Sequence, residues 1–170
     1  MDKNFFTLEQ AARIIGLKPK EKWRVIKFVQ SKEYGLKSSA GSAAGSGSRR
    51  YYELDDLCEL ALALRLLETG LRSMVIGKII RQLREKNDTT LNALVRAQGK
   101  DADLRLVIIR KPEVGKPLDE KREQIVCWVS TVSEAEKLWS ANPARDVILV
   151  PVGQMLSGFK HRLAASTVSR

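Results

Sequence analysis

Residues 7–52 read TLEQAARIIGLKPKEKWRVIKFVQSKEYGLKSSAGSAAGSGSRRYY, and this stretch decides the fold that we expect for the first half of the chain. It predicts two short helices joined by a glycine turn. Thr7 and Gln10 have the spacing of a capping box, which marks the start of a helix. Residues 8–15 repeat apolar side chains at helical spacing. Gly16 is typical of a helix end, because glycine adopts a left-handed backbone at little cost.

A second helix is predicted from Pro19 to about residue 33, where Tyr34-Gly35 stops it. Proline suits the first helical turn because it lacks the N–H that would be unpaired there. We assign Trp23, Ile26 and Val29 to the core face, with Val25 and Phe28 beside them. The opposite face repeats polar side chains at helical spacing, namely Lys20, Arg24, Lys27 and Ser31.

Positive charge is concentrated in the same part of the chain. Between Lys18 and Tyr52 there are nine Lys or Arg and two Glu, a local charge of +7, whereas the whole chain of 170 residues carries +10. A row of cations on a helix is most often a solvated face. The same row also suits DNA phosphates and the O6 and N7 edges of guanine. Charge alone leaves both interpretations open.

Residues 38–48 contain only serine, alanine and glycine. This composition predicts a flexible connection, and it fits a native wing, a disordered tether or an engineered tether alike.

The next two predicted helices form the core of the first half. Residues 54–69 are apolar on most sides, begin with acidic residues that favour a helix N-terminus, and are followed by Gly70. They predict the central helix. The following helix starts at Ser73 as N-cap and ends before Asn87-Asp88, with an inward face of Val75, Ile76, Ile79, Ile80 and Leu83. Thr89 or Thr90 then begins a short amphipathic segment that Gly99 closes.

After Gly99 the hydrophobic period changes from helical to alternating and continuous apolar runs. Residues 104–110 and 124–129 predict two strands that pair as an antiparallel hairpin. A helix from Ser133, a buried strand at 146–152 and a last helix near 155–165 complete the order β-β-α-β-α.

The predicted fold class is therefore α+β, with an N-terminal helical domain followed by a small C-terminal α/β module. We place the first domain at 1–87, a connecting helix and linker at 88–103, and the module at 104–170. A module of about 70 residues is marginal alone, so we expect it to pack on the first domain or on a second copy.

Several classes of function are disfavoured by composition. Cys58, Cys127 and His161 are too few for a structural zinc site, and the cysteines, set among apolar residues, read as buried hydrophobes rather than as redox groups. We expect His161 to be solvated. No apolar run is long enough to span a membrane and no secretory signal is evident, so a cytoplasmic location is expected by default.

No grouping of residues predicts catalysis, a metal or a cofactor, so we expect a protein that is not an enzyme. Trp128 and Trp139 fit an apolar ligand pocket, and more commonly such tryptophans belong to a small core.

The first half resembles the DNA-binding domain of MerR-type transcriptional regulators, a winged helix-turn-helix. TLEQAARIIGL, from Thr7, is followed by a lysine-rich helix as in that family. Arg50 and Tyr52 stand where the family has Arg-x-Tyr at the exit of its wing. Asp56-Leu57 and Gly70 follow at the family's spacing, with Ile76 in the position of a core isoleucine. The resemblance covers about residues 5–84.

The resemblance implies a sequence-specific regulator that binds double-stranded DNA, from a bacterium, a bacteriophage or a plasmid. Helix 19–33 would read the duplex and a basic wing ending at 49–52 would flank it; a homodimer is a further expectation. The implied DNA contacts are Lys18, Lys20, Arg24, Lys27, Arg49, Arg50, Tyr51 and Tyr52. Tyr52 and Trp23 fit the core equally, and for Trp23 we favour the core.

The chain also departs from the family pattern. Trp23-Arg24 stands where the family has arginine followed by tyrosine, Ser73 replaces a leucine, and the run at 38–48 replaces a compact basic hairpin. Family members continue into a long dimerisation helix, whereas here the pattern breaks at Asn87-Asp88. An interaction or scaffold protein that uses the same fold to bind protein, or a ligand-binding or enzymatic C-terminal module, remains an alternative.

Overall fold

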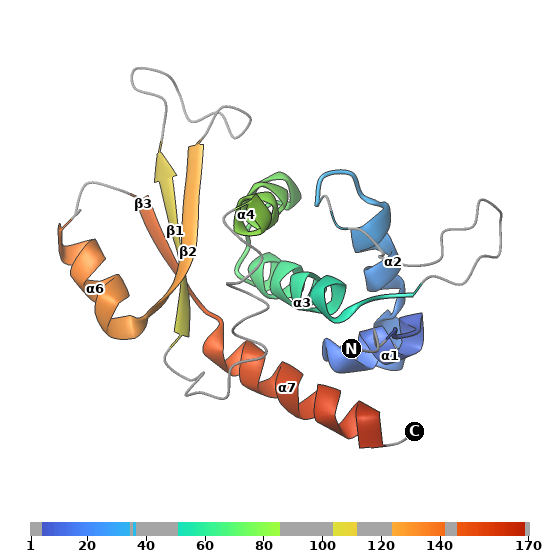
Figure 1. The fold of residues 1–170 in the computed structure, drawn as a ribbon. Helices are drawn as coiled ribbons and strands as arrows, with labels where there is room; N and C mark the ends of the chain where they lie inside the picture. The colour runs from blue at the N-terminus through green and yellow to red at the C-terminus, as the bar shows by residue number, and fades with distance from the viewer. Residues whose placement is uncertain are drawn as a thin grey trace.

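The chain folds into a mixed α+β structure, with helices first and a small three-stranded sheet after them (Figure 1). The computed structural model describes residues 5–34, 36, 51–85, 104–111, 124–141 and 146–168. Its elements are α1 (Leu8–Ile14), the 3-10 turn η1 (Pro19–Glu21), α2 (Trp23–Gln30), α3 (Leu54–Glu68), α4 (Ser73–Glu85), β1 (Leu104–Lys111), β2 (Gln124–Thr131), α6 (Val132–Ala141), β3 (Asp146–Pro151) and α7 (Gly153–Val168). The predicted α+β class and the β-β-α-β-α order are confirmed.

Several predicted features lie outside the described residues, among them the 38–48 run, the break at Asn87-Asp88 and the short helix between Thr89 and Gly99.

The start of α1 has the predicted capping box. The Thr7 hydroxyl accepts from the Gln10 amide at 3.4 Å, and the Gln10 side-chain oxygen accepts from the Thr7 amide at 2.9 Å. Gly16 follows the helix with φ of +89°, a left-handed conformation in which any other residue is strained. Both predicted ends of the first helix are therefore confirmed to within one residue.

The second helix is shorter than predicted. Pro19 does start helical structure, but the chain first forms η1, in which Glu21 N donates to Lys18 O at 2.8 Å. α2 then runs only from Trp23 to Gln30, and the backbone is extended at Ser31. The predicted helix 19–33 therefore begins at Pro19 as a 3-10 turn, and its predicted end is wrong, because the chain leaves the helix after Gln30 and buries Tyr34 in the core.

α3 is the central helix, as predicted. It is buried along nearly its whole length, and Glu53 N donates to the Asp56 carboxylate at 2.8 Å to begin it. Gly70 ends it with φ of +83°. Arg84 of α4 holds Glu59 of α3 with two hydrogen bonds, one from Nε to Oε1 at 2.5 Å.

α4 buries all five predicted inward residues, which are Val75, Ile76, Ile79, Ile80 and Leu83. Ser73 was expected to be its N-cap but is its first residue, and the Ser73 hydroxyl donates to the Glu33 carboxylate instead.

The sheet has the order β2-β1-β3, and both pairs are antiparallel, so the predicted hairpin is confirmed. Ile108 in the central strand stands opposite Cys127 and Ile148. β1 is the fully buried strand, from Leu106 to Ile109. The third strand was expected to be fully buried, but β3 lies at an edge of the sheet, and Leu149 is only half-buried there.

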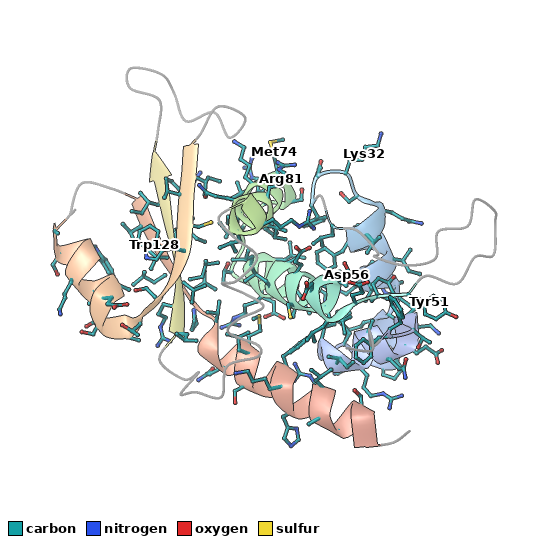
Figure 2. The ribbon with its side chains drawn as sticks, in the orientation of Figure 1. Lys32, Tyr51, Asp56, Met74, Arg81 and Trp128 are labelled. Atoms are coloured by element: carbon teal, nitrogen blue, oxygen red, sulfur yellow. The ribbon has the colours of Figure 1, made fainter. Side chains whose placement is uncertain are left out.

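The two faces of the sheet are covered differently. Leu106 and Ile108 share one hydrophobic cluster with the N-terminal helices. Val107 and Ile109 face the other way and pack with Ala135 of α6, where Trp128 is half-buried (Figure 2). Trp139 on α6 is exposed, so its expected place in the core is wrong.

The C-terminal elements pack directly on the N-terminal helices. The Cys127 amide of β2 donates to the Gln82 side chain of α4 at 3.0 Å. α7 returns from the sheet toward α1 (Figure 1), where Arg162 Nε donates to the Ile14 carbonyl at 2.7 Å. Burial lowers the pKa of the Arg162 guanidinium. The positive charge of Arg162 also complements the C-terminal end of α1, where carbonyl groups lack helical partners.

Candidate nucleic-acid interface

The outward face of α2 consists of Trp23, Lys27 and Gln30, which are all exposed. Val25 and Phe28 on the opposite side are buried. Each residue turns an α-helix by about 100°, so positions i, i+4 and i+7 form one stripe. The predicted core face was therefore rotated: Trp23 is 54% exposed and does not belong to the core.

The predicted cations of this region lie at or near the surface: Lys18, Lys20 and Lys27 are exposed, and Arg24 is half-buried. Arg24 Nη1 lies 3.6 Å from Glu21 Oε1, and Lys22 Nζ lies 3.1 Å from Glu9 Oε1. Surface ion pairs of this kind contribute about 0–1 kcal/mol, so phosphate groups can compete for either cation. The Lys27 ammonium lies 6.0 Å from the centre of the Trp23 ring, near the limit of a cation–π contact.

Of the four predicted wing contacts, two lie outside the described residues, one is half-buried and one is buried. Arg49 and Arg50 lie outside the described residues. Tyr51 is half-buried. Tyr52 is fully buried, and its backbone pairs with Phe6 through hydrogen bonds of 2.9 and 3.0 Å. The suggested contact of the Tyr52 side chain with DNA is therefore corrected, because this pairing turns the ring into the core.

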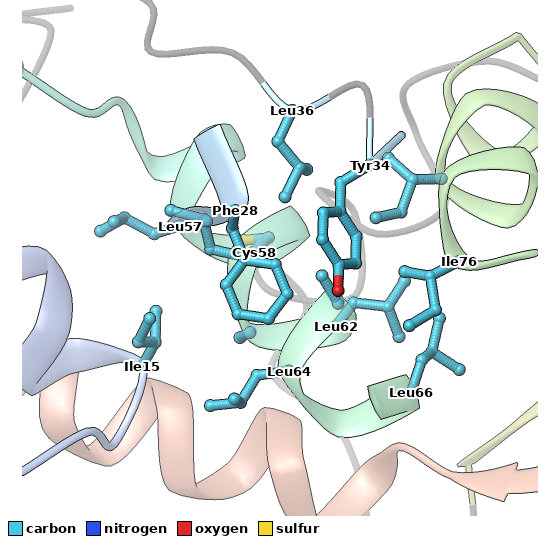
Figure 3. Packing of buried hydrophobic residues seen from close by; sticks show 14 of the residues in the cluster. Ile15, Phe28, Tyr34, Leu36, Leu57, Cys58, Leu62, Leu64, Leu66 and Ile76 are labelled. Atoms are coloured by element: carbon cyan, nitrogen blue, oxygen red, sulfur yellow. The ribbon is translucent and has the colours of Figure 1, made fainter. Parts of the chain in front are cut away.

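An open cavity of about 230 Å³ lies beside the Trp23 indole. Its walls are Trp23, Arg24, Lys27, Phe28, Tyr34 and Leu67. The rings of Phe28 and Tyr34 meet edge to face with centroids 4.7 Å apart (Figure 3). The cavity is thus apolar and aromatic at its base and carries cations at its α2 side.

The pKa of the Tyr34 phenol, in the wall of this cavity, depends on burial and on two nearby charges. Burial raises the pKa of the Tyr34 phenol, Glu33 raises it further, and Arg24 lowers it. A negative charge on the phenol is therefore unfavourable where the ring packs against Phe28.

The turn after α2 is fixed against α4. A Cβ atom on Gly77 would lie 1.8 Å from the backbone oxygen of Glu33, so only glycine allows this approach. The Ser73 hydroxyl donates to the Glu33 carboxylate at the same junction. The end of α2 is therefore held against α4, while its outward face is exposed.

Other kinds of site receive little support. Among the described residues, no three His, Cys, Asp or Glu side chains gather as metal ligands would. Cys58 and Cys127 are buried, in agreement with their interpretation as small hydrophobes, and His161 is exposed as expected. Of the helices that the structure describes, none is long and apolar enough to cross a membrane.

Sequence reasoning missed two residues of the outward face, Trp23 and Gln30. The usable signal was the spacing of Val25 and Phe28, which by itself predicts that position 23 faces outward. The size and apolarity of the indole favoured the core instead.

No family model matches the chain, and no curated protein is significantly similar to it. We therefore take the exposed face of α2 and its cations as the candidate interface.

Proposed function

We propose that the protein binds duplex DNA as a MerR-like transcriptional regulator and that α2 enters the major groove. The observation that carries this proposal is the division of α2 into a buried face, with Val25 and Phe28, and an outward face with Lys27 in a region of net charge +7. Cations on a rigid helix neutralise phosphates and release counterions, which drives association with DNA.

The surrounding geometry supports the same proposal. α1 and α2 are consecutive α-helices, joined by the turn at Gly16 and by the 3-10 turn η1, with α2 second. In a helix-turn-helix the second helix lies in the major groove and its N-terminal residues contact base edges. Eight residues of α2 span about 12 Å, enough for three or four base pairs.

The proposal includes a cytoplasmic homodimer, which would present two copies of α2 to half-sites one helical turn apart. DNA-binding proteins of this class commonly show this symmetry. Phosphate contacts would position the protein and a few base contacts would give specificity.

The test is a salt titration of binding to a duplex selected by the protein from a random library. Six phosphate contacts predict a slope of about −5 in a plot of log K against log salt. Lys27→Ala should make the slope about 0.9 shallower, because one contact is lost. Lys137→Ala is the matched control: it also removes an exposed lysine from a helix, but from α6, and it should leave the slope unchanged.

The proposal would be contradicted if the protein bound no duplex at low salt. It would also be contradicted if binding changed neither with salt nor with the Lys27 substitution. The chain would then be an interaction protein that uses the same helical surface for a protein partner.

A further inference from the structure

We propose that Trp23 reads the methyl group of a thymine in the major groove, which makes it a specificity-determining residue. This inference rests on the proposed binding of duplex DNA by α2. Trp23 is the first residue of α2 and is 54% exposed, at the end of the helix that would reach the bases.

The chemistry of the groove selects the ligand. An exposed indole is an apolar surface that gains free energy when a partner buries it. Among the groups at base edges in the major groove, the thymine C5 methyl is apolar, whereas the others are hydrogen-bond donors and acceptors. An apolar side chain at the front of a basic helix therefore fits a thymine better than any other base.

The cavity beside the indole gives this methyl group a place. Phe28, Tyr34 and Leu67 supply apolar lining next to Trp23, and the open volume of about 230 Å³ exceeds that of a methyl group. Phe28 and Tyr34 are themselves nearly buried, so the lining is fixed by the core.

The cations around the cavity favour a base that lies within a phosphate backbone. Lys27 Nζ lies 6.0 Å from the indole centre, and Arg24 forms the adjoining wall. Both cations are placed to contact phosphates when the indole contacts the base edge. A neutral apolar ligand would make no use of them.

The experiment uses the full chain and the duplex that it selects. Each thymine is replaced in turn by deoxyuridine, which removes the methyl group and keeps the hydrogen-bonding pattern. At one position we expect the replacement to weaken binding about four-fold, the loss for one buried methyl group. Trp23→Ala should weaken binding to the unmodified duplex by roughly ten-fold, as truncation of an interface anchor does.

The decisive comparison is between these two changes. In Trp23→Ala the deoxyuridine effect should fall well below four-fold, because the methyl group has lost the exposed wall of its cavity. Trp139→Ala is the matched control: Trp139 is 53% exposed, but it lies on α6, so its variant should bind like the wild type and keep the four-fold effect. Circular dichroism of both variants checks that they are folded, and Trp23→Phe should retain part of the effect.

Each result decides a separate point. If no deoxyuridine replacement weakens wild-type binding, or if the effect persists in Trp23→Ala, the thymine inference is overturned while DNA binding stands. If no duplex is bound in a salt-dependent way, the proposed function fails and the inference fails with it.

Discussion

α2 and α3 are both rich in apolar residues, yet they are buried in different ways. α3 extends over 15 residues and is buried on most of its sides. α2 has eight residues, buries Val25 and Phe28, and leaves Trp23 and Lys27 in solvent. A helix enclosed by the core has no surface left for a partner, whereas a helix anchored along one stripe keeps the other stripe for contact. The comparison indicates that α3 carries stability, and it leaves α2 as the helix for which we propose DNA recognition.

The largest expected effect is a loss of stability on truncating α3. Leu66→Ala removes a fully buried side chain and should lower the free energy of unfolding by about 2–5 kcal/mol. Trp23→Ala on α2 should change it by no more than about 0.5 kcal/mol, as surface substitutions do. Urea unfolding followed by circular dichroism measures both. Equal losses for the two variants would show that the indole belongs to the core and would remove the contrast between the helices.

The next effect tests how α2 is held. Gly77→Ala would place a Cβ atom 1.8 Å from the Glu33 backbone oxygen, in the turn that follows α2. We expect a loss of about 1–3 kcal/mol, because backbone has to move. Gly158→Ala in α7 is the matched control, since the nearest atom to its Cβ would be a side-chain nitrogen of Arg162 at 3.1 Å rather than backbone at 1.8 Å. It should cost less stability than Gly77→Ala, because the contact is longer and alanine favours the helix by up to about 1 kcal/mol.

If Gly77→Ala lost no stability, the turn after α2 would not be fixed against α4. The variant is informative for binding as well. A displaced turn should weaken DNA binding even though Gly77 lies on α4, whereas Gly158→Ala should bind normally.

The sequence predicted α3 and α4 well, because their signals are local and repeat over several turns. Gly70 closes α3 as expected, and the apolar spacing in α4 identified every inward residue that we named. The strands at 104–111 and 124–131 were equally clear from their continuous apolar runs.

The C-terminal limit of α2 was harder to predict, since contacts distant in sequence determine it. The ring of Tyr34 packs on the ring of Phe28. The absence of a side chain at Gly77 of α4 lets the backbone of Glu33 approach α4 closely. Neither contact can be recognised from the spacing of apolar residues within the eight residues of α2. In the same way, Arg162 and the Ile14 carbonyl that it binds are 148 positions apart in the sequence, so no local pattern could indicate that α7 packs on α1.

The smallest effect concerns pH and the base of α2. Because burial raises the pKa of the Tyr34 phenol, the folded chain keeps this proton at a pH where the unfolded chain has lost it. The stability that the phenol contributes is full below its ordinary pKa of 10.0 and is lost as the pH rises through the folded pKa. Tyr34→Phe has no such proton, so its melting temperature should fall less steeply than that of the wild type above pH 10. The two proteins should differ little at pH 7, and thermal melts from pH 7 to 11 provide the measurement. Parallel alkaline slopes would show that the ring is not held against Phe28. The end of α2 would then lack the fixed position on which its proposed role in DNA recognition depends.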